Sequence, residues 1–319
     1  VVAGLTEDAR QALDELIAVG GRVSTASFAR RFGGVRPLGS GARERERPHL
    51  YPAQPTEALW YRGLIGRAFR DEGSGPQEFF FVPNELIQLL PSRSQVRRHR
   101  TYISSVYQPN NGVALASASL VDDACTTLAY LRLFPASPGR PEQLLATEYT
   151  SELRTHLLQP DALGILLHLL QELGLVTGYP MCVNSGKARR FLQATRGEQQ
   201  GSLVNAWHHS VEWCDVIHVP GLRFDEPSSL RTDARKTRQA ILEQLAHLTP
   251  RHWIDLSSFV DHVREHVPDF QRMAGDYDAW YVFDSKTGEH LRGFHNWDRV
   301  DGALVEFMIF GPLHWLGIT

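Results

Sequence analysis

The first part of the chain alternates apolar and polar residues with the period of a helix. Between residues 7 and 19 the apolar side chains lie three and four positions apart, at Ala9, Leu13, Leu16 and Ile17. This spacing predicts an amphipathic helix. The pair Gly20-Gly21 follows at once, and glycines in this position are expected to end a helix.

Two further helix starts and a hairpin follow the first helix. Ser24-Thr25 can cap a short second helix, and after an Arg- and Pro-rich loop Thr56 can cap a third over residues 57–65. Residues 67–70 and 78–82 then flank a turn-rich segment, which predicts a β-hairpin. Three helices followed by a hairpin is the order of a winged-helix domain, in which the third helix usually reads a DNA groove.

The remaining chain is predicted to be mainly α-helical. Helices are expected over residues 84–90, 119–134, 142–158, 162–173, 186–194, 201–213, 234–248, 256–267 and 303–310, with short strands at 253–254 and 280–283. The predicted fold class is therefore mainly α with small β-hairpins (α+β), arranged as tandem winged-helix-like domains.

Turn-rich stretches suggest where these domains meet. We predict a winged-helix domain at 1–91, a connector at 92–118, a helical, winged-helix-like domain at 119–222 and another winged-helix-like domain at 223–319. The last of these ends inside an apolar stretch, which we interpret as a chain cut from a longer one.

Charge is distributed unevenly. Residues 1–105 hold 15 Arg, no Lys and 11 Asp or Glu, a net charge of +4, whereas the remainder carries −7. The whole chain has a net charge of −3, which argues against a protein that coats nucleic acid through bulk charge. Any phosphate-binding surface is therefore expected in the N-terminal part.

Arginine suits such a surface because its guanidinium binds phosphate oxygens in a bidentate manner. Arg22, Arg43, Arg45 and Arg47 belong to the same N-terminal cluster, and the residues predicted to contact nucleic acid are Arg30, Arg31, Arg36, Arg62, Arg67, Arg70, Arg93, Arg97, Arg98 and Arg100. An equally weighted alternative is that these residues are ordinary solvated cations, because the chain uses only three Lys.

The third predicted helix offers little for reading bases. The side chains expected to face inward are Leu59, Leu64 and Ile65, and those expected to face outward are Glu57, Arg62 and Arg67. One or two outward Arg are few for base contacts, so we expect binding chiefly through phosphates.

Four segments carry a resemblance: Gly33-Gly34-Val35-Arg36 and residues 57–65, 188–207 and 253–270. They resemble bacterial proteins with a domain similar to the N-terminal region of XPB-type repair helicases. The resemblance spans most of the chain and implies winged-helix modules, association with nucleic acid and a longer parent chain. Helicase activity is not implied, because the chain lacks the phosphate-cradling GxxxxGK[ST] motif and an acidic ATPase box.

One motif has the spacing of a catalytic metal site. His262, Glu265 and His266 match the HxxEH pattern of zinc peptidases, yet this segment also has an ordinary amphipathic helix pattern. Neither Cys125, Cys182 and Cys214 nor the remaining His residues show ligand spacing. We predict no catalytic residue, no metal and no cofactor, and we expect most Trp side chains to be core residues rather than stacking faces for bases.

These observations predict a non-enzymatic module that binds DNA, duplex more than single-stranded, as part of a longer helicase-associated or regulatory protein. The alternative is a protein-interaction scaffold that uses the acidic C-terminal two-thirds, and a zinc peptidase with His262, Glu265 and His266 is a distant third. No apolar run is long enough to cross a bilayer and no signal peptide is evident, so we expect no membrane partner and a cytoplasmic location.

Overall fold

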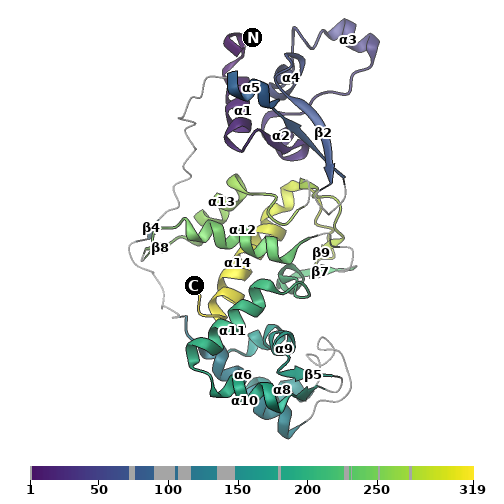
Figure 1. Ribbon diagram of the computed structural model, residues 1–319. Coiled ribbons are helices and arrows are strands. Elements are labelled where there is room, and N and C mark those ends of the chain that lie inside the picture. Colours follow the sequence, from purple (N-terminus) through teal and green to yellow (C-terminus); the bar gives the residue numbers. More distant parts are fainter. Residues whose placement is uncertain are drawn as a thin grey trace. The chain divides into compact units, whose positions relative to one another are not determined.

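The chain forms two compact units, seen in a computed structural model (Figure 1). The structure describes residues 2–71, 76–89, 105–106, 116–134, 148–178, 181–225, 230, 232–250, 252–272 and 275–319. Unit 1 comprises Val1–Tyr102 with Arg272–Trp280, and unit 2 comprises Ile103–Gln271 with Tyr281–Thr319. Both fit the predicted class, because helices dominate and the sheets are small and antiparallel.

Unit 1 combines helices with one three-stranded sheet. Its elements are α1 (Glu7–Ala18), β1 (Arg22–Ser24), α2 (Thr25–Phe32), α3 (Ser40–Glu46), α4 (Pro55–Tyr61), β2 (Gly66–Asp71), β3 (Pro76–Phe81) and α5 (Asn84–Leu89). The strands are antiparallel in the order β1-β3-β2. The predicted first two helices and the hairpin are confirmed, whereas α3 lies in a segment expected to be a loop.

Side-chain caps explain where the first helices begin. The Thr6 hydroxyl accepts a hydrogen bond from the Ala9 amide at 3.3 Å, and the Ser24 hydroxyl accepts one from Ser27 at 3.1 Å. Such caps satisfy amide groups that the helix itself leaves unpaired. The buried faces of α1, α2 and β3 then form the core of unit 1, where the Phe28 and Phe80 rings lie 5.8 Å apart.

The third predicted helix begins and ends earlier than expected. Helix α4 begins at Pro55 rather than after Thr56, and it ends at Tyr61. Thr56 does not cap it; its buried hydroxyl donates a hydrogen bond to the Phe32 carbonyl at 3.3 Å. The prediction that Glu57 faces outward is wrong, because its side chain is fully buried and its carboxylate accepts hydrogen bonds from Arg36.

Unit 2 is built mainly from helices with three two-stranded sheets. Its elements are β4 (Ser105–Val106), α6 (Ser119–Leu133), α8 (Glu148–Thr155), α9 (Leu163–Glu172), β5 (Val176–Thr177), β6 (Cys182–Val183), α10 (Ser185–Gln193), α11 (Arg196–His209), β7 (Leu222–Phe224), α12 (Ala234–Ala246), β8 (Trp253–Ile254), α13 (Leu256–His266), β9 (Val282–Asp284) and α14 (Ala303–Met308). The paired strands are β4 with β8, β5 with β6 and β7 with β9.

The helix predicted over residues 201–213 begins earlier than expected. Helix α11 starts at Arg196, where Thr195 and Glu198 form a reciprocal capping box. The Thr195 hydroxyl accepts from the Glu198 amide at 3.3 Å, and the Glu198 carboxylate accepts from the Thr195 amide at 2.8 Å. This Thr-x-x-Glu pattern is a helix-start signal that the prediction overlooked.

The core of unit 2 centres on α9, as its apolar pattern predicts. Leu163, Leu166, Leu169 and Leu170 are fully buried. The two domains predicted at 119–222 and 223–319 both lie in unit 2 apart from residues 272–280, and most of the predicted connector lies outside the described residues. Among the described helices, none combines the length and apolar character that a bilayer crossing requires.

Candidate functional site

Arg36, one of the predicted phosphate ligands, is engaged inside unit 1. Its Nη2 lies 2.9 Å from Glu57 Oε2, its Nε 3.0 Å from Glu57 Oε1, and its Nη1 2.6 Å from Glu46 Oε2. The Ala53 amide also donates to Glu57 Oε2 at 2.7 Å. Arg36 and Glu57 thereby fasten both ends of the segment that contains α3.

The protonation of Glu57 follows from these contacts. Burial alone would raise its pKa, but the hydrogen bonds from Arg36 and from the Ala53 amide outweigh burial and leave the pKa below its usual value. The carboxylate is therefore charged at neutral pH, which keeps the pair with Arg36 intact.

Two further predicted arginines form ion pairs with acidic residues of unit 1. Arg31 Nη1 lies 2.7 Å from Glu15 Oε2, and Arg67 Nε lies 3.3 Å from Glu78 Oε1. Both guanidinium groups remain about half exposed. Exposed pairs of this kind contribute only about 0–1 kcal/mol, so a phosphate could displace either carboxylate at little cost.

The remaining predicted arginines have varied surroundings. Arg30 Nη1 donates to the Gly275 carbonyl at 3.0 Å within unit 1. Arg62 is half buried, and its Nη1 has no hydrogen-bond partner in the described part of the chain. Arg70 is exposed on β2. The residues predicted at positions 93, 97, 98 and 100 (all Arg) lie outside the described residues.

A run of exposed arginines lies on α3 and directly after it. No residue of this helix is buried, and Arg43, Arg45 and Arg47 are all exposed. Within the described ranges none of these three has an acidic partner. Sequence reasoning placed them in the basic cluster but took the segment for a loop, so it left them out of the candidate site.

A compact turn continues from the end of α3. Arg47 adopts a left-handed conformation with a φ of 45°, and its carbonyl accepts hydrogen bonds from the Leu50 and Tyr51 amides at 2.8 and 2.9 Å. Pro48 is buried, whereas Tyr51 is 72% exposed. We call residues 40–51 the α3 turn. It presents three guanidinium groups and an aromatic ring to solvent.

Helix α4 is poorly placed to enter a groove. Its residues Thr56 to Leu59 are buried, and the other three, Pro55, Trp60 and Tyr61, are only partly exposed. A recognition helix contacts bases with side chains that stand free of its own domain. The α3 turn therefore offers a better contact surface than the helix that the sequence favoured.

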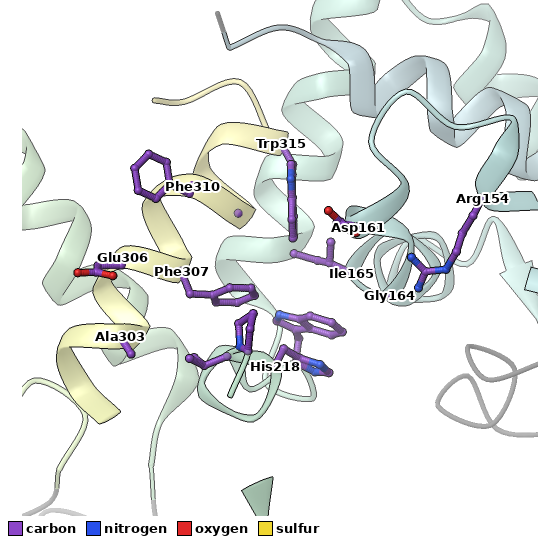
Figure 2. Close-up of a pocket in the computed structure, with 14 residues that line it drawn as sticks. Arg154, Asp161, Gly164, Ile165, His218, Ala303, Glu306, Phe307, Phe310 and Trp315 are labelled. Carbon is purple, nitrogen blue, oxygen red and sulfur yellow. The ribbon is translucent and has the colours of Figure 1, made fainter. Parts of the chain in front are cut away.

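Unit 2 contains a separate feature, a cleft of about 640 Å³ (Figure 2). Its lining comes from α8, α9, the segment after α11 and the C-terminal helices: Arg154, Asp161, Gly164, Ile165, Trp213, His218, Val219, Pro220, Ala303, Glu306, Phe307, Phe310, Gly311 and Trp315. The lining is predominantly apolar, and aromatic rings contribute much of it. We call this the aromatic cleft.

A buried ion pair holds one wall of the aromatic cleft. Arg238 Nε lies 2.7 Å from Asp215 Oδ2, and both side chains are buried. Asp215 Oδ1 also accepts from Trp213 Nε1 at 3.0 Å and from Trp207 Nε1 at 3.1 Å. Arg238 further donates to the carbonyls of Trp207, Ser210 and Trp213. These bonds fix the Trp213 indole in one orientation.

The imidazole of His218 lies flat on Trp213. The ring centroids are 3.7 Å apart and the planes differ by 4°. Although part of the residue is exposed, burial of the ring lowers the pKa of His218 to about 4, with Asp215 opposing the shift. His218 is therefore neutral at physiological pH, and it adds no positive charge to the cleft.

The opposite wall comes from the C-terminal helical segment. Phe307 and Trp315 pack edge to face at 6.1 Å and 84°, and Figure 2 shows both directed towards the side of Ile165 and His218. Phe310 and Glu306 point away from that side. Phe310 is 68% exposed, and both acidic residues of the lining, Asp161 and Glu306, are exposed.

The HxxEH motif lies on α13 as an ordinary helical pattern. The His262 and His266 rings are stacked at 4.1 Å, His262 Nε2 lies 3.3 Å from Gln244 Oε1, and His266 Nδ1 lies 2.9 Å from the His262 carbonyl oxygen. Nowhere among the described residues do three or more His, Cys, Asp or Glu side chains form a metal-holding group. The geometry gives the peptidase hypothesis no further support.

Comparison with known proteins adds no relative. No protein-family model, no curated protein and no solved structure matches this chain. The resemblance to proteins with an XPB-like N-terminal domain therefore stays a prediction from the sequence.

Proposed function

We propose that the protein is a non-enzymatic module that binds nucleic acid through unit 1, with duplex DNA as the preferred ligand. The observation that carries the proposal is the α3 turn, where Arg43, Arg45 and Arg47 are exposed and lack acidic partners in the described structure. Free guanidinium groups on one short segment suit a phosphate backbone, because each can replace a condensed counterion.

The arrangement of unit 1 supports the same proposal. Its order of helix, strand, two helices and an antiparallel hairpin, with an added helix before α4, agrees with a winged-helix layout. Arg67 and Arg70 lie on β2 of the hairpin, where a wing would approach the backbone. Arg36 would act indirectly, since its contacts with Glu57 and Glu46 position the α3 turn.

The proposed contacts are chiefly to phosphates and not to bases. Helix α4 is largely buried, and the α3 turn carries flexible Arg side chains without amide side chains that pair with base edges. Binding should therefore depend strongly on salt and only weakly on sequence. This behaviour is expected of a module that accompanies another domain in a longer helicase-associated or regulatory protein.

Fluorescence anisotropy with a labelled mixed-sequence duplex tests the proposal. The triple variant Arg43→Ala, Arg45→Ala, Arg47→Ala should bind more weakly and reduce the slope of log K against log salt by about 3, close to one for each lost phosphate contact. A matched control is Arg189→Ala, Arg190→Ala, Arg235→Ala, because these arginines are exposed on unit 2.

The two variants make the outcomes distinct. Loss of affinity with the α3 variant alone supports the proposal. Equal loss with both variants would instead indicate binding through diffuse charge, and no binding of the wild-type chain even at low salt would exclude DNA as its ligand.

A protein-interaction scaffold is the second candidate function. The observation that favours it is the aromatic cleft of unit 2, because an apolar surface bordered by acidic side chains is typical of a protein-binding site. The two functions are compatible, since they use different units.

A further inference from the structure

The aromatic cleft of unit 2 has the features of a site for a particular kind of polypeptide. We propose that it binds a peptide segment that inserts an aromatic or large aliphatic side chain and carries basic residues beside it. This inference concerns unit 2 alone and does not depend on nucleic-acid binding by unit 1.

The wall that would receive the inserted side chain is rigid. Trp213 is held by its indole hydrogen bond to Asp215, which is held in turn by the buried Arg238. The His218 ring covers the indole at 3.7 Å. A wall fixed in advance does not lose side-chain entropy when a ligand binds, so more of the contact energy appears as affinity.

The lining of the cleft is mainly apolar and aromatic. Phe307, Trp315 and Ile165 complete an apolar space of about 640 Å³ around Trp213. Such a volume can take one large side chain together with part of its backbone. Interface hot spots are pockets of this kind, in which a buried aromatic or aliphatic anchor supplies most of the binding energy.

The apolar surface continues outside the cleft. Phe310 belongs to the lining and is nevertheless 68% exposed, and Figure 2 shows it directed away from Phe307 and Trp315. A small ligand held inside the cleft would leave this ring in water. A polypeptide that continues past its anchor would cover it, which favours a peptide over a small molecule.

The charge around the cleft favours a basic ligand. Asp161 and Glu306 are exposed at the cleft, and residues 106–319 carry a net charge of −7. Among the described residues of the lining, Arg154 is the one cation, and its Nη1 donates to the Pro160 carbonyl at 2.7 Å. The acidic side chains therefore favour Lys or Arg beside the anchor and disfavour a nucleic-acid backbone.

Peptide selection on the full chain tests the proposal. Short random peptides displayed on phage are selected against the wild-type protein, and the enriched sequences are synthesised and titrated by calorimetry. We expect enriched peptides to contain Trp, Phe or Leu next to Lys or Arg. Enrichment of acidic peptides, or no enrichment, would overturn the proposal.

Two variants locate the binding, and both change exposed side chains, so the fold should be preserved. Phe310→Ser should weaken binding by about tenfold, as expected for loss of an aromatic contact at an interface. Glu306→Lys should weaken binding of a basic peptide, and reversing the peptide's basic residue to Glu should restore it. Leu192→Ser, at a residue 50% exposed on α10 and outside the lining, should have no effect.

The same variants distinguish other occupants. Peptides that bind Phe310→Ser and Glu306→Lys as tightly as the wild type would place the site elsewhere and sink the proposal. Sedimentation of the wild-type chain supplies a second check, since a dimer that Phe310→Ser dissociates would show that a second copy of the chain, not a basic peptide, covers the cleft.

Discussion

Each unit buries a carboxylate that holds an arginine, but the two pairs differ in how much of the arginine reaches water. Glu57 is fully buried while its partner Arg36 keeps 35% of its side chain exposed; Arg238 of unit 2 has none exposed and Asp215 only 1%. In unit 1 the pair ties a surface segment to the core. In unit 2 the pair is part of the core itself.

The difference shows what a buried charge needs. Arg238 places its donors on Asp215 and three backbone carbonyls, and Asp215 also accepts from two indoles. Moving the two ions out of water costs roughly several kcal/mol of folding free energy for each ion, and only such complete hydrogen bonding offsets that cost. Arg36 needs fewer partners, because water still solvates part of its guanidinium.

The largest effect is expected from Arg238→Met. This change leaves Asp215 as an uncompensated buried charge, and breaking a pair of this kind destabilises by about 3–5 kcal/mol. Urea denaturation followed by tryptophan fluorescence measures the loss. Arg235→Met is the matched control on the same helix, because Arg235 is exposed; a similar loss in both variants would contradict a special role for the buried pair.

A smaller effect is expected from Glu57→Ala. The variant removes the acceptor of the Ala53 amide and of the Nε and Nη2 groups of Arg36, at a cost of about 1–3 kcal/mol. Hydrogen exchange should rise in residues 33–54 more than elsewhere in unit 1. Glu46→Ala removes only the exposed partner of Arg36 and should change hydrogen exchange little. Unchanged exchange in Glu57→Ala would show that Glu57 does not hold the segment that contains α3.

The two units should also respond to acid at different pH values. Burial depresses the pKa of His218 from 6.5 to about 4, so its contribution is complete above pH 6.5 and is lost as pH falls towards 4. Glu57 also has a depressed pKa, below 4.5, so its contribution is lost only below about pH 4.5.

The stability of unit 2 is therefore expected to fall between pH 6.5 and 5, while the Arg36–Glu57 contacts that hold the α3 turn stay intact. Hydrogen exchange of the two units across this range measures both. His218→Gln should remove part of the slope in unit 2, and an unchanged slope would assign the effect to other groups. NMR titration of the His218 ring should show a midpoint near pH 4, well below 6.5.

The smallest effect is expected from the exposed pair of Arg196 and Asp122, whose closest atoms are 2.5 Å apart. Both side chains are about half exposed, and pairs solvated to this degree add little. Asp122→Asn should leave the urea midpoint of unit 2 almost unchanged. A loss comparable to that of Arg238→Met would mean that burial does not decide the strength of these pairs.

Most elements with a local signal were predicted, although the capping box that begins α11 was overlooked, and α3, which lacks such a signal, was missed. Helices α1 and α2 have hydroxyl caps next to an apolar period, and both were predicted. Helix α3 begins after Gly39, whose position offers no side-chain cap, and all its side chains lie outside the core, so no apolar period marks it. The burial of Glu57 on α4 was not predicted, because the partner of its carboxylate, Arg36, lies 21 residues away in the sequence.

The candidate site was predicted to the level of a basic cluster. Composition located that cluster in the N-terminal part, but only the fold determines that Arg31, Arg36 and Arg67 meet carboxylates while Arg43 and Arg45 do not. The predicted burial of most Trp side chains is confirmed for Trp207, Trp213, Trp280 and Trp297.

The aromatic cleft was not predicted at all. Its two walls, at Trp213 and at Phe307 with Trp315, are separated by more than ninety positions in the sequence. Local periodicity carries no information about pairings at such a distance, so Trp213 and Trp315 were grouped with the Trp side chains expected in the core.

Unit 1 consists of two stretches that lie far apart in the sequence. This affects when the unit can fold during synthesis on the ribosome. Arg30 contacts Gly275 and lies 5.0 Å from the ring of Tyr277, and both Tyr277 and Trp280 are buried. At ~5–20 residues per second, translation from Tyr102 to Trp280 takes on the order of 10 to 40 s. During that interval residues 1–102 lack the segment that completes their unit.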